Sequence, residues 1–180
     1  MRVISGSLRG RRLREPEDNS IRPTTDKVKE SIFNIIQFDI EGRNVLDLFA
    51  GTGQLGIECI SRGAKSVTFV DKSRASLDLV AQNLRLCGVQ GRTVCADSIE
   101  FLRHCGKYDL IILDPPYAAG LINEALEAIE LIDILTEGGI IVCESMREKA
   151  LRDVKPPYYR KKEYNYGKVK LTVFVKETSL

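Results

Sequence analysis

The sequence predicts one α/β domain, in which a seven-stranded, mostly parallel sheet carries helices on both faces and ends in an antiparallel hairpin. In the middle of the chain, short apolar runs typical of buried strands alternate with segments whose apolar residues recur at helical spacing. Near the end, two strand-like runs, 158–164 and 168–175, are separated only by Asn165-Tyr166-Gly167. Because a parallel pair needs a crossover of about a dozen residues, these two runs must pair antiparallel.

Composition limits the kind of protein. The chain has 180 residues, of which 43% are hydrophobic and 29% charged, as in ordinary globular domains. No apolar run could span a bilayer and no signal sequence opens the chain, so we expect a cytoplasmic protein without a membrane anchor. The five cysteines include no C-x-x-C pair and the single histidine is His104, so we expect reduced core cysteines and no metal site.

Residues 1–20 are expected to form a basic extension in front of a main domain at 21–180. Gly6 and Gly10 interrupt short apolar positions, which indicates a small N-terminal β-hairpin over 2–14. A helix should follow, because a threonine cap precedes Asp26 and an apolar stripe runs from Val28 to Ile36. We expect this helix to pack on the sheet and to close over a ligand cleft.

The central elements then alternate. We expect strands at 44–49, 66–70, 93–96, 108–113 and 140–143, and helices at 54–62, after Ser73, after Ser98 and around Ile122 to Ile129. Glycines should end the helices, and Gly138-Gly139 should break the chain before the fifth strand. This alternation implies right-handed crossovers between parallel strands.

The stretch 44–56 is a buried strand that runs into a glycine turn and a helix. Gly51-x-Gly53-x-x-Gly56, with Asp71 twenty residues after Gly51, also satisfies the fingerprint of NAD-binding proteins. Asp47 argues against NAD, because a carboxylate there repels a pyrophosphate but accepts from an ammonium group. S-adenosylmethionine, with its sulfonium, ammonium and ribose diol, suits this site. A tight turn without a ligand is the simpler alternative.

Four acids follow four successive strands: Asp47, Asp71, Asp97 and Asp114. Since the carboxyl ends of parallel strands meet at one edge of a sheet, we expect these carboxylates to surround one pocket. Asp71 is placed to accept from ribose hydroxyls, and Asp97 with Ser98 to accept from an adenine amine. Each acid alone could instead be a helix cap.

Asp114-Pro115-Pro116-Tyr117 is the most specific motif. Two prolines keep the backbone extended, so a carbonyl can face the cleft beside the Asp114 carboxylate. Together these acceptors can hold both hydrogens of a planar exocyclic amine, while Tyr117 stacks on the base. Holding the amine this way aims its lone pair at a sulfonium methyl, so that transfer depends mostly on positioning. A rigid turn after a strand is the alternative.

Both ends of the chain are basic. Arg9, Arg11 and Arg12 lie in a stretch of 14 residues without an acid, and a second basic cluster near the end contains Arg160, Lys161 and Lys162. Acidic residues outnumber basic ones in between. This distribution indicates a polyanion partner held by the two ends, although solvated charge that only aids solubility would give a similar pattern.

These motifs resemble a known family. Asp47-Leu48-Phe49-Ala50-Gly51-Thr52-Gly53 with Asp114-Pro115-Pro116-Tyr117 looks like an S-adenosylmethionine-dependent N-methyltransferase. Ser5-Gly6-x-x-Arg9-Gly10, Arg22-Pro23-Thr24-Thr25-Asp26 and Tyr166-Gly167 resemble the RsmD-type bacterial methyltransferases of 16S ribosomal RNA over nearly the whole chain. The resemblance implies a Rossmann-like class I methyltransferase fold. It also implies methylation of the exocyclic N2 of guanine(966), in the family's RNA numbering, in 16S rRNA or the assembling small ribosomal subunit.

The expected roles can be assigned residue by residue, and we expect a monomer. Catalysis is assigned to Asp114, Pro115, Pro116 and Tyr117. Cofactor binding is assigned to Asp47, Phe49, Ala50, Gly51, Thr52, Gly53, Asp71, Lys72, Asp97 and Ser98, with Arg22 and Thr24 near the cofactor or the base. RNA binding is assigned to Arg9, Arg11, Arg12, Arg160, Lys161 and Lys162.

Three alternatives remain open. Adenine-N6 methylation of DNA or RNA would use the same Asp-Pro-Pro-Tyr chemistry, although the chain has no room for a separate domain that selects a DNA sequence. An NAD-dependent dehydrogenase is disfavoured by Asp47 and by the hairpin tail. A non-catalytic RNA-binding module would need no cleft lined by four acids.

Overall fold

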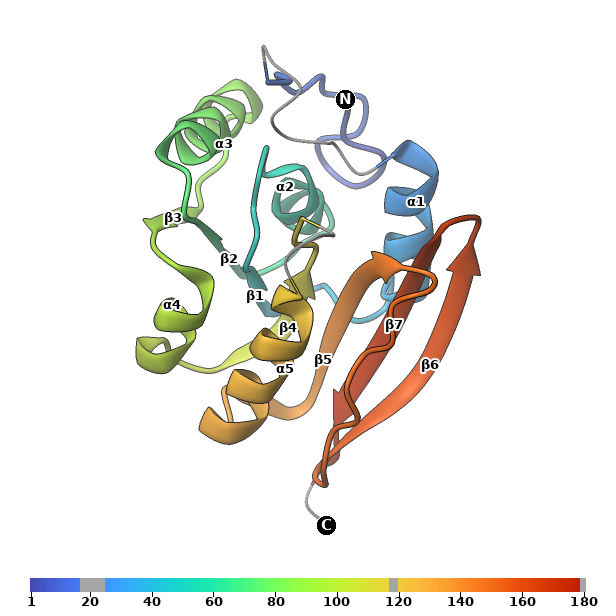
Figure 1. Ribbon diagram of the computed structural model, residues 1–180. Coiled ribbons are helices and arrows are strands. Elements are labelled where there is room, and N and C mark those ends of the chain that lie inside the picture. Colours follow the sequence, from blue (N-terminus) through green and yellow to red (C-terminus); the bar gives the residue numbers. More distant parts are fainter. Residues whose placement is uncertain (17–24, 117–119, 179–180) are drawn as a thin grey trace.

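One seven-stranded sheet forms the middle layer of the protein, in the order β3-β2-β1-β4-β5-β7-β6 (Figure 1). The structure is a computed structural model that describes residues 1–16, 25–116 and 120–178. β1 to β5 run parallel, and β7 lies antiparallel between β5 and β6. The strands are β1 (Asn44–Asp47), β2 (Ser66–Asp71), β3 (Arg92–Cys95), β4 (Tyr108–Leu113), β5 (Leu135–Met146), β6 (Tyr158–Tyr166) and β7 (Val169–Lys176).

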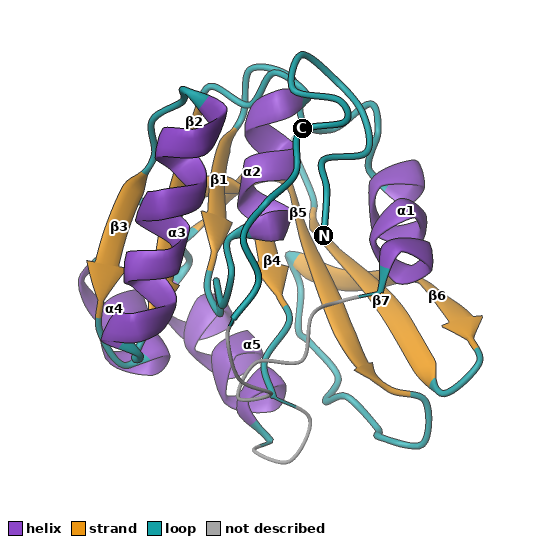
Figure 2. Ribbon diagram, turned by 90° about the horizontal axis from the view of Figure 1, so that it is seen from above, coloured by secondary structure: helices purple, strands orange, loops and turns teal. Residues whose placement is uncertain are grey.

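Helices cover both faces of this sheet. The helices are α1 (Asp26–Ile35), α2 (Gln54–Ser61), α3 (Arg74–Cys87), α4 (Ser98–His104) and α5 (Leu121–Ile132). One apolar core lies between the sheet and α1, α2 and α3, and a second lies between the sheet and α4 and α5. Figure 2 shows α2 and α3 alongside β1 to β3. The predicted α/β fold, with its mostly parallel sheet and C-terminal hairpin, is confirmed.

Local signals explain where the helices begin and end. The Thr25 hydroxyl accepts from the amide of Val28 at the start of α1, and Ser73 accepts from Ser76 at the start of α3. Gly88 ends α3 in the left-handed conformation, with φ of 68°. In α1, Val28 and Ile32 are buried in the same core as α2, so the helix packs on the sheet as expected.

The prediction that Gly138-Gly139 would break the chain before the fifth strand is wrong. β5 runs through both glycines, and its pairing with β4 shifts register between Leu135 and Ile140. Gly138 adopts a φ of 67°, which an L side chain rarely tolerates, so the pair forms an irregularity inside a strand. β5 is therefore long enough to pair with both β4 and β7.

The turn of the C-terminal hairpin is tighter than predicted. β6 continues to Tyr166, which pairs with Val169, so Gly167 and Lys168 alone connect the strands. Gly167 has a φ of 60°, as two-residue hairpin turns require. Leu171 and Val173 belong to the core under α1 and α2, as the alternating pattern predicted.

The N-terminal segment folds back on itself without forming a regular hairpin. Its strands are reduced to one antiparallel bridge between Arg2 and Arg12. Hydrogen bonds to other elements replace a longer ladder: the Glu58 carboxylate on α2 accepts from the amides of Ile4 and Ser5. The division of the chain into an extension at 1–20 and a domain at 21–180 stays a prediction.

All five cysteines are free; Cys59, Cys87 and Cys143 are buried, and Cys105 is half-buried. Cys95 is exposed, contrary to the expected core position, because β3 is an edge strand. In the described part of the chain, no helix is long and apolar enough to cross a membrane.

Candidate active site

The carboxyl ends of the parallel strands bring three acids close together. Asp47 ends β1, Asp71 ends β2, and Asp114 directly follows β4. Asp47 is 1% exposed. The pKa of Asp47 is raised to about 7 in total. Burial is the largest cause, the hydrogen bond from the Gly56 amide acts in the opposite direction, and the negative charges of Asp114 and Asp71 raise the pKa further. The clustering of these three acids therefore has an electrostatic consequence: a buried carboxylate that forms no ion pair with any of the described residues.

The glycine turn wraps around the Asp47 carboxylate. Gly51 and Gly53 have φ values of 53° and 78°, and Gly53 precedes α2 without a side-chain cap. Asp47 Oδ2 accepts from the amide of Gly56 at 3.0 Å, inside the first turn of α2. A carboxylate is favoured there by the helix dipole as well as by the hydrogen bond. Asp47 thus holds the start of α2 against the end of β1.

Gly56 has a different role from the other two glycines. A Cβ added at Gly56 would lie 2.2 Å from the ring of Phe69 on β2. The absence of a side chain lets α2 approach the sheet closely, which is the role of the third glycine in turns of this kind.

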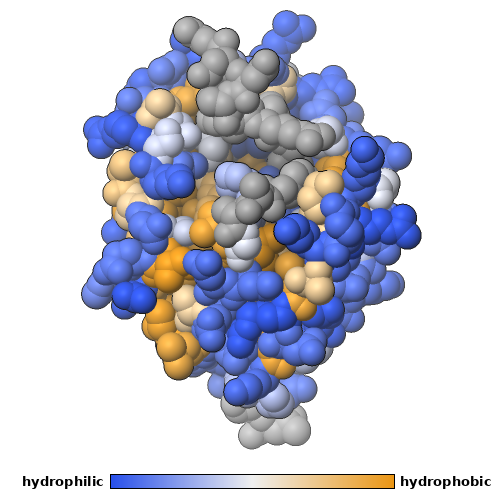
Figure 3. All heavy atoms as spheres, viewed as in Figure 1, coloured by the Kyte–Doolittle hydropathy of each residue, from blue (hydrophilic) through white to orange (hydrophobic). Residues whose placement is uncertain are grey.

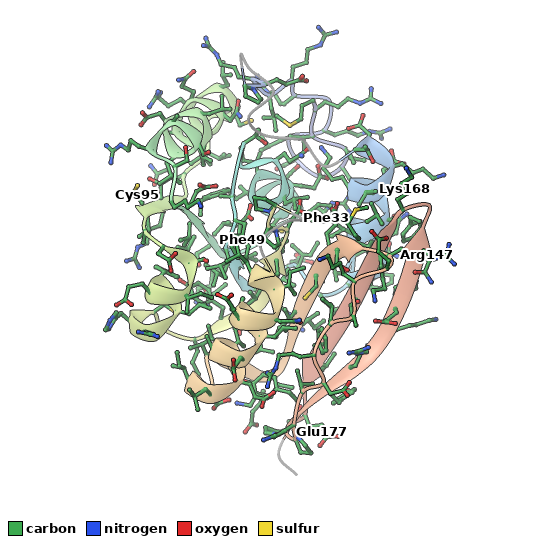
Figure 4. The ribbon with its side chains drawn as sticks, in the orientation of Figure 1. Phe33, Phe49, Cys95, Arg147, Lys168 and Glu177 are labelled. Carbon is green, nitrogen blue, oxygen red and sulfur yellow. The ribbon has the colours of Figure 1, made fainter. Side chains whose placement is uncertain are left out.

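Asp71 is tied to the glycine turn. Its Oδ2 accepts from the amide of Gly51 at 2.9 Å, and its Oδ1 accepts from the amide of Ser73 at 2.8 Å. A carboxylate has about four acceptor positions, so these two bonds leave capacity for hydroxyl donors. Phe49 is half-buried and Ala50 is buried beside this turn, and Figure 4 shows Phe49 near the centre of the edge.

Asp97 lies at the same edge but caps a helix. Its Oδ1 accepts from the amides of Ile99 and Glu100 at 3.0 and 3.1 Å, at the start of α4. Ser98 is buried behind it, and Lys72 is exposed on the loop after β2. Cys95 Sγ donates to the Lys72 carbonyl, which joins the ends of β2 and β3. We call the ends of β1, β2 and β3, with Asp47, Asp71 and Asp97, the acidic half of the edge.

The other half of the edge contains a mostly apolar cavity. It lies beside Asp114, between the ends of β4 and β5 and the start of α5, has a volume of about 50 Å³ and is open to solvent on one side. Its walls are Pro115, Pro116, Gly120, Leu121, Ile122, Asn123, Ser145, Met146, Lys149, Ala150 and Leu151. We call it the apolar half. Figure 3 shows apolar surface over α4 and α5 on this side of the molecule, bordered by hydrophilic side chains.

The predicted basic residues differ in position. Arg9, Arg11 and Arg12 are exposed, but the neighbouring residues Ser7 and Leu8 bond to Ser61 at the far end of α2. This part of the N-terminal segment therefore lies away from the glycine turn. Arg14 is closer, because its backbone bonds to Asn83, which also donates to the Thr52 carbonyl.

The second basic cluster is divided. Arg160 donates to the carbonyls of Leu151 and Arg152 and pairs with Glu163, so its guanidinium supports the protein itself. Lys161 and Lys162 are exposed on β6, which forms the edge of the sheet. Both lysines lie beside the middle of the sheet and not at its carboxyl edge. Lys162 pairs with Val173, and Val173 pairs with Val142 in the middle of β5.

Three predicted site residues, Arg22, Thr24 and Tyr117, lie outside the residues that the structure describes. Sequence reasoning missed other residues at the edge. Asn83 is fully buried and links Arg14 to Thr52, and its place in an ordinary helical pattern gave no signal. Arg147 was also missed; it meets Lys168, a member of the predicted basic cluster, at the tip of β5 and β7, where the Arg147 amide donates to the Lys168 carbonyl (Figure 4).

The described residues hold no group of three or more His, Cys, Asp or Glu side chains that could bind a metal ion. The arrangement instead suits an organic cation. A carboxylate buried beneath a glycine turn, next to a second carboxylate with spare acceptor positions, can bind an ammonium group, whose charge favours the ionised form of the buried acid, and a diol.

The sheet order and the edge define the class: this is the Rossmann-like fold of class I methyltransferases. A solved structure titled "Putative methyltransferase yhhF from Escherichia coli" superposes with a TM-score of 0.89, at 30% identity over 99% of each chain. A structure titled as a putative methylase from Haemophilus influenzae gives a TM-score of 0.81 at 29% identity, over 98% of each chain.

The chain belongs to the family described as Conserved hypothetical protein 95, whose profile matches residues 1–175. It is 38% identical over 182 residues to the Bacillus subtilis protein named "Putative rRNA methyltransferase YlbH", covering 98% of this chain and 99% of that one. It is 33% identical over 179 residues to Ribosomal RNA small subunit methyltransferase D of Escherichia coli K12, covering 98% and 90%. The resemblance to RsmD-type methyltransferases is confirmed.

Proposed function

We propose that this protein methylates the exocyclic N2 of a guanine in 16S rRNA, at guanine(966) in the family's RNA numbering, with S-adenosylmethionine as the methyl donor. The observation that carries the proposal is the pairing of the two halves of one edge: the buried carboxylate of Asp47, with the half-buried Asp71 beside it, suited to a cationic cofactor, and an apolar cavity next to Asp114. The names of the full-length relatives support ribosomal RNA as the acceptor.

The acidic half would hold the cofactor. Asp47 would accept a hydrogen bond from the ammonium group in the methionine part of the cofactor. This cation would offset the negative charge of the buried carboxylate. Asp71 accepts from the ribose hydroxyls while its bonds to Gly51 and Ser73 hold it in place. Asp97 accepts from the adenine amine with the oxygen that does not cap α4. When bound, S-adenosylmethionine supplies a methyl group activated by a sulfonium.

The apolar half would hold the acceptor base. Asp114 and the carbonyl of Pro115 accept from the two N–H groups of the amine, which directs the nitrogen lone pair toward the acidic half. The amine proton leaves to Asp114 or to water after transfer. The apolar walls exclude water from this step, which strengthens both hydrogen bonds. Tyr117 is proposed to stack on the base.

Arginine and lysine side chains would bind the RNA backbone. Arg9, Arg11 and Arg12 are exposed and belong to a segment that contacts α2, so they present fixed positive charge to phosphates. Of the C-terminal cluster, Lys161 and Lys162 remain in this role, and Arg160 is left out because its guanidinium is engaged within the protein.

Two measurements test the proposal. Titration calorimetry should detect binding of S-adenosylmethionine to the protein and no binding of NAD. If only NAD binds, the protein is not a methyltransferase that uses S-adenosylmethionine. Small ribosomal subunits and naked 16S rRNA from a strain without this protein should then be incubated with the protein and labelled cofactor. We expect label on N2 of one guanine; label on N6 of an adenine would favour the rival adenine methyltransferase.

A further inference from the structure

The apolar cavity contains a buried hydroxyl without a partner. Ser145 is 3% exposed and lines the cavity, and its Oγ makes no hydrogen bond within the described ranges. An unpaired buried hydroxyl is destabilising, and it is expected where a ligand completes the hydrogen bond. The rest of the cavity wall is mostly apolar, so this hydroxyl is a specific polar contact for whatever enters.

The sheet register places Ser145 beside the catalytic motif. Leu113, the last residue of β4, pairs with Cys143 on β5, and Pro115 and Ser145, each two residues further on, line the same cavity. Cys143 belongs to the core beneath α5, and alternation along the strand puts Ser145 on that same face. Ser145 therefore lies two residues beyond the partner of the last residue of β4, on the face of the sheet that borders the cavity.

Hydrogen bonds fix the wall around Ser145. The Lys149 amide donates to the Met146 carbonyl, and Lys170 Nζ donates to the Lys149 carbonyl, both at 3.0 Å. On the other side, Asn123 on α5 accepts from the Arg152 amide at 2.9 Å. The segment after β5 is thus held to β7 and α5, so the cavity is formed before any ligand binds.

We propose that Ser145 determines base specificity by hydrogen-bonding to O6 of the acceptor guanine, an inference that rests on the proposed function. Along the Watson–Crick edge of guanine, the N2 amine, N1–H and O6 follow one another. With N2 held at Asp114, O6 points toward β5, where Ser145 Oγ can donate to it. In adenine the order is the N6 amine, N1 and C2–H, so an adenine held by its amine places an apolar C–H against Ser145 and leaves the hydroxyl unpaired.

The test is a double-mutant cycle between Ser145→Ala and a target base that lacks O6. An RNA with 2-aminopurine at the target keeps the amine that accepts the methyl group but has hydrogen in place of O6 and no hydrogen on N1, so only the part of the loss that Ser145→Ala abolishes is assigned to O6. For the wild-type protein, kcat/KM should fall roughly 10- to 100-fold from guanine to 2-aminopurine. Ser145→Ala should lose a similar factor on guanine and then discriminate by less than about threefold.

Two controls separate recognition from folding. Ser145→Ala should have a melting temperature no lower than wild type, because the removed hydroxyl has no partner; a structural role would lower it. Ser31→Ala removes a buried hydroxyl that bonds to the Lys27 carbonyl in α1, and it should keep the full discrimination against 2-aminopurine.

The outcomes distinguish this inference from the proposed function. If the wild-type protein methylates guanine but treats 2-aminopurine equally, or if the two losses simply multiply, Ser145 does not read O6 and the proposed function still stands. If the wild-type protein transfers no methyl group to guanine-bearing RNA, the proposed function fails and this inference fails with it. Ser145→Thr, which retains the hydroxyl, should recover most of the discrimination.

Discussion

The two halves of the carboxyl edge are built in different ways. In the acidic half, each carboxylate bonds to backbone amides within about ten residues along the chain or at a neighbouring turn: Asp47 to Gly56, Asp97 to Ile99 and Asp71 to Gly51 and Ser73. In the apolar half, the cavity walls come from β4, α5, β5 and the segment after it. The acidic half therefore repeats one local arrangement, a strand end followed by a turn and a helix start, at three neighbouring strands, whereas the apolar half is assembled from β4, α5, β5 and the segment after it.

The largest effect should come from the boundary between the halves. Asp114→Ala removes an acceptor for the amine but leaves the acidic half intact, so kcat should fall about 10²- to 10⁴-fold. The affinity for S-adenosylmethionine should change little. Single-turnover methyl transfer and titration calorimetry measure the two quantities. Full activity, or a loss confined to cofactor affinity, would show that Asp114 does not hold the acceptor amine.

Within the acidic half, Asp47→Asn should stabilise the ligand-free protein at alkaline pH. The pKa of Asp47 is raised from 3.8 to about 7, so the folded protein loses stability as pH rises between these values and carries the full penalty above pH 7. The asparagine variant lacks this penalty and should be more stable by on the order of 1–4 kcal/mol at pH 8, with no advantage near pH 4.

Urea unfolding of both proteins from pH 4 to pH 8 gives this difference directly. A difference that does not grow with pH would show that Asp47 titrates normally. The same variant should bind S-adenosylmethionine more weakly, because the carboxylate no longer balances the ammonium group; unchanged affinity would mean that the cofactor's cation is held elsewhere.

Gly56→Ala tests whether the acidic half depends on the close approach of α2 to β2. The added Cβ would lie 2.2 Å from the Phe69 ring, so we expect a loss of about 1–3 kcal/mol in the free energy of unfolding. Gly106→Ala is the matched control, because no atom lies within 4 Å of its added Cβ. Thermal or urea unfolding checks both, and equal effects would argue against a packing role for Gly56.

The smallest effect concerns the periphery of both halves. Arg11→Glu with Arg12→Glu should weaken RNA binding and reduce the slope of log affinity against log salt by about one unit for each lost phosphate contact. Lys161→Glu with Lys162→Glu tests the cluster on β6 in the same assay. Filter binding at several salt concentrations measures the slopes; a slope unchanged in the arginine variant would show that the N-terminal segment does not contact phosphates.

The acidic half could be predicted from sequence because its signals are local. The glycine turn, the strand-end acids and the Ser73 and Gly88 helix ends all depend on neighbouring residues, and the structure has them as predicted. For Asp97 the prediction of a ligand contact stays a prediction, while the helix-cap alternative is what its Oδ1 does in this structure. Both uses of one carboxylate are compatible, so the sequence could not choose between them.

The apolar half could not be predicted in the same way. Ser145 and Leu151 reach the cavity because β5 continues past Cys143 to Met146 in its pairing with β7, and because Lys170 and Asn123 fix the following segment. The glycine pair looked like a chain break, since a bulge that preserves a strand depends on the neighbouring strand. Arg160 shows the same limit: its charge was visible in the sequence, but its bonds to Leu151 and Arg152 were not.

The place of β7 between β5 and β6 has a consequence for biosynthesis. β5 pairs along one side with β4, and its other side is completed only by β7, which is translated after β6. Until residues 169–176 have left the ribosome, β5 presents an open edge of unpaired amides and carbonyls. A polypeptide stalled before this point could form the acidic half but would lack the strand that supports the apolar half. Its exposed β5 edge would be a site for aggregation.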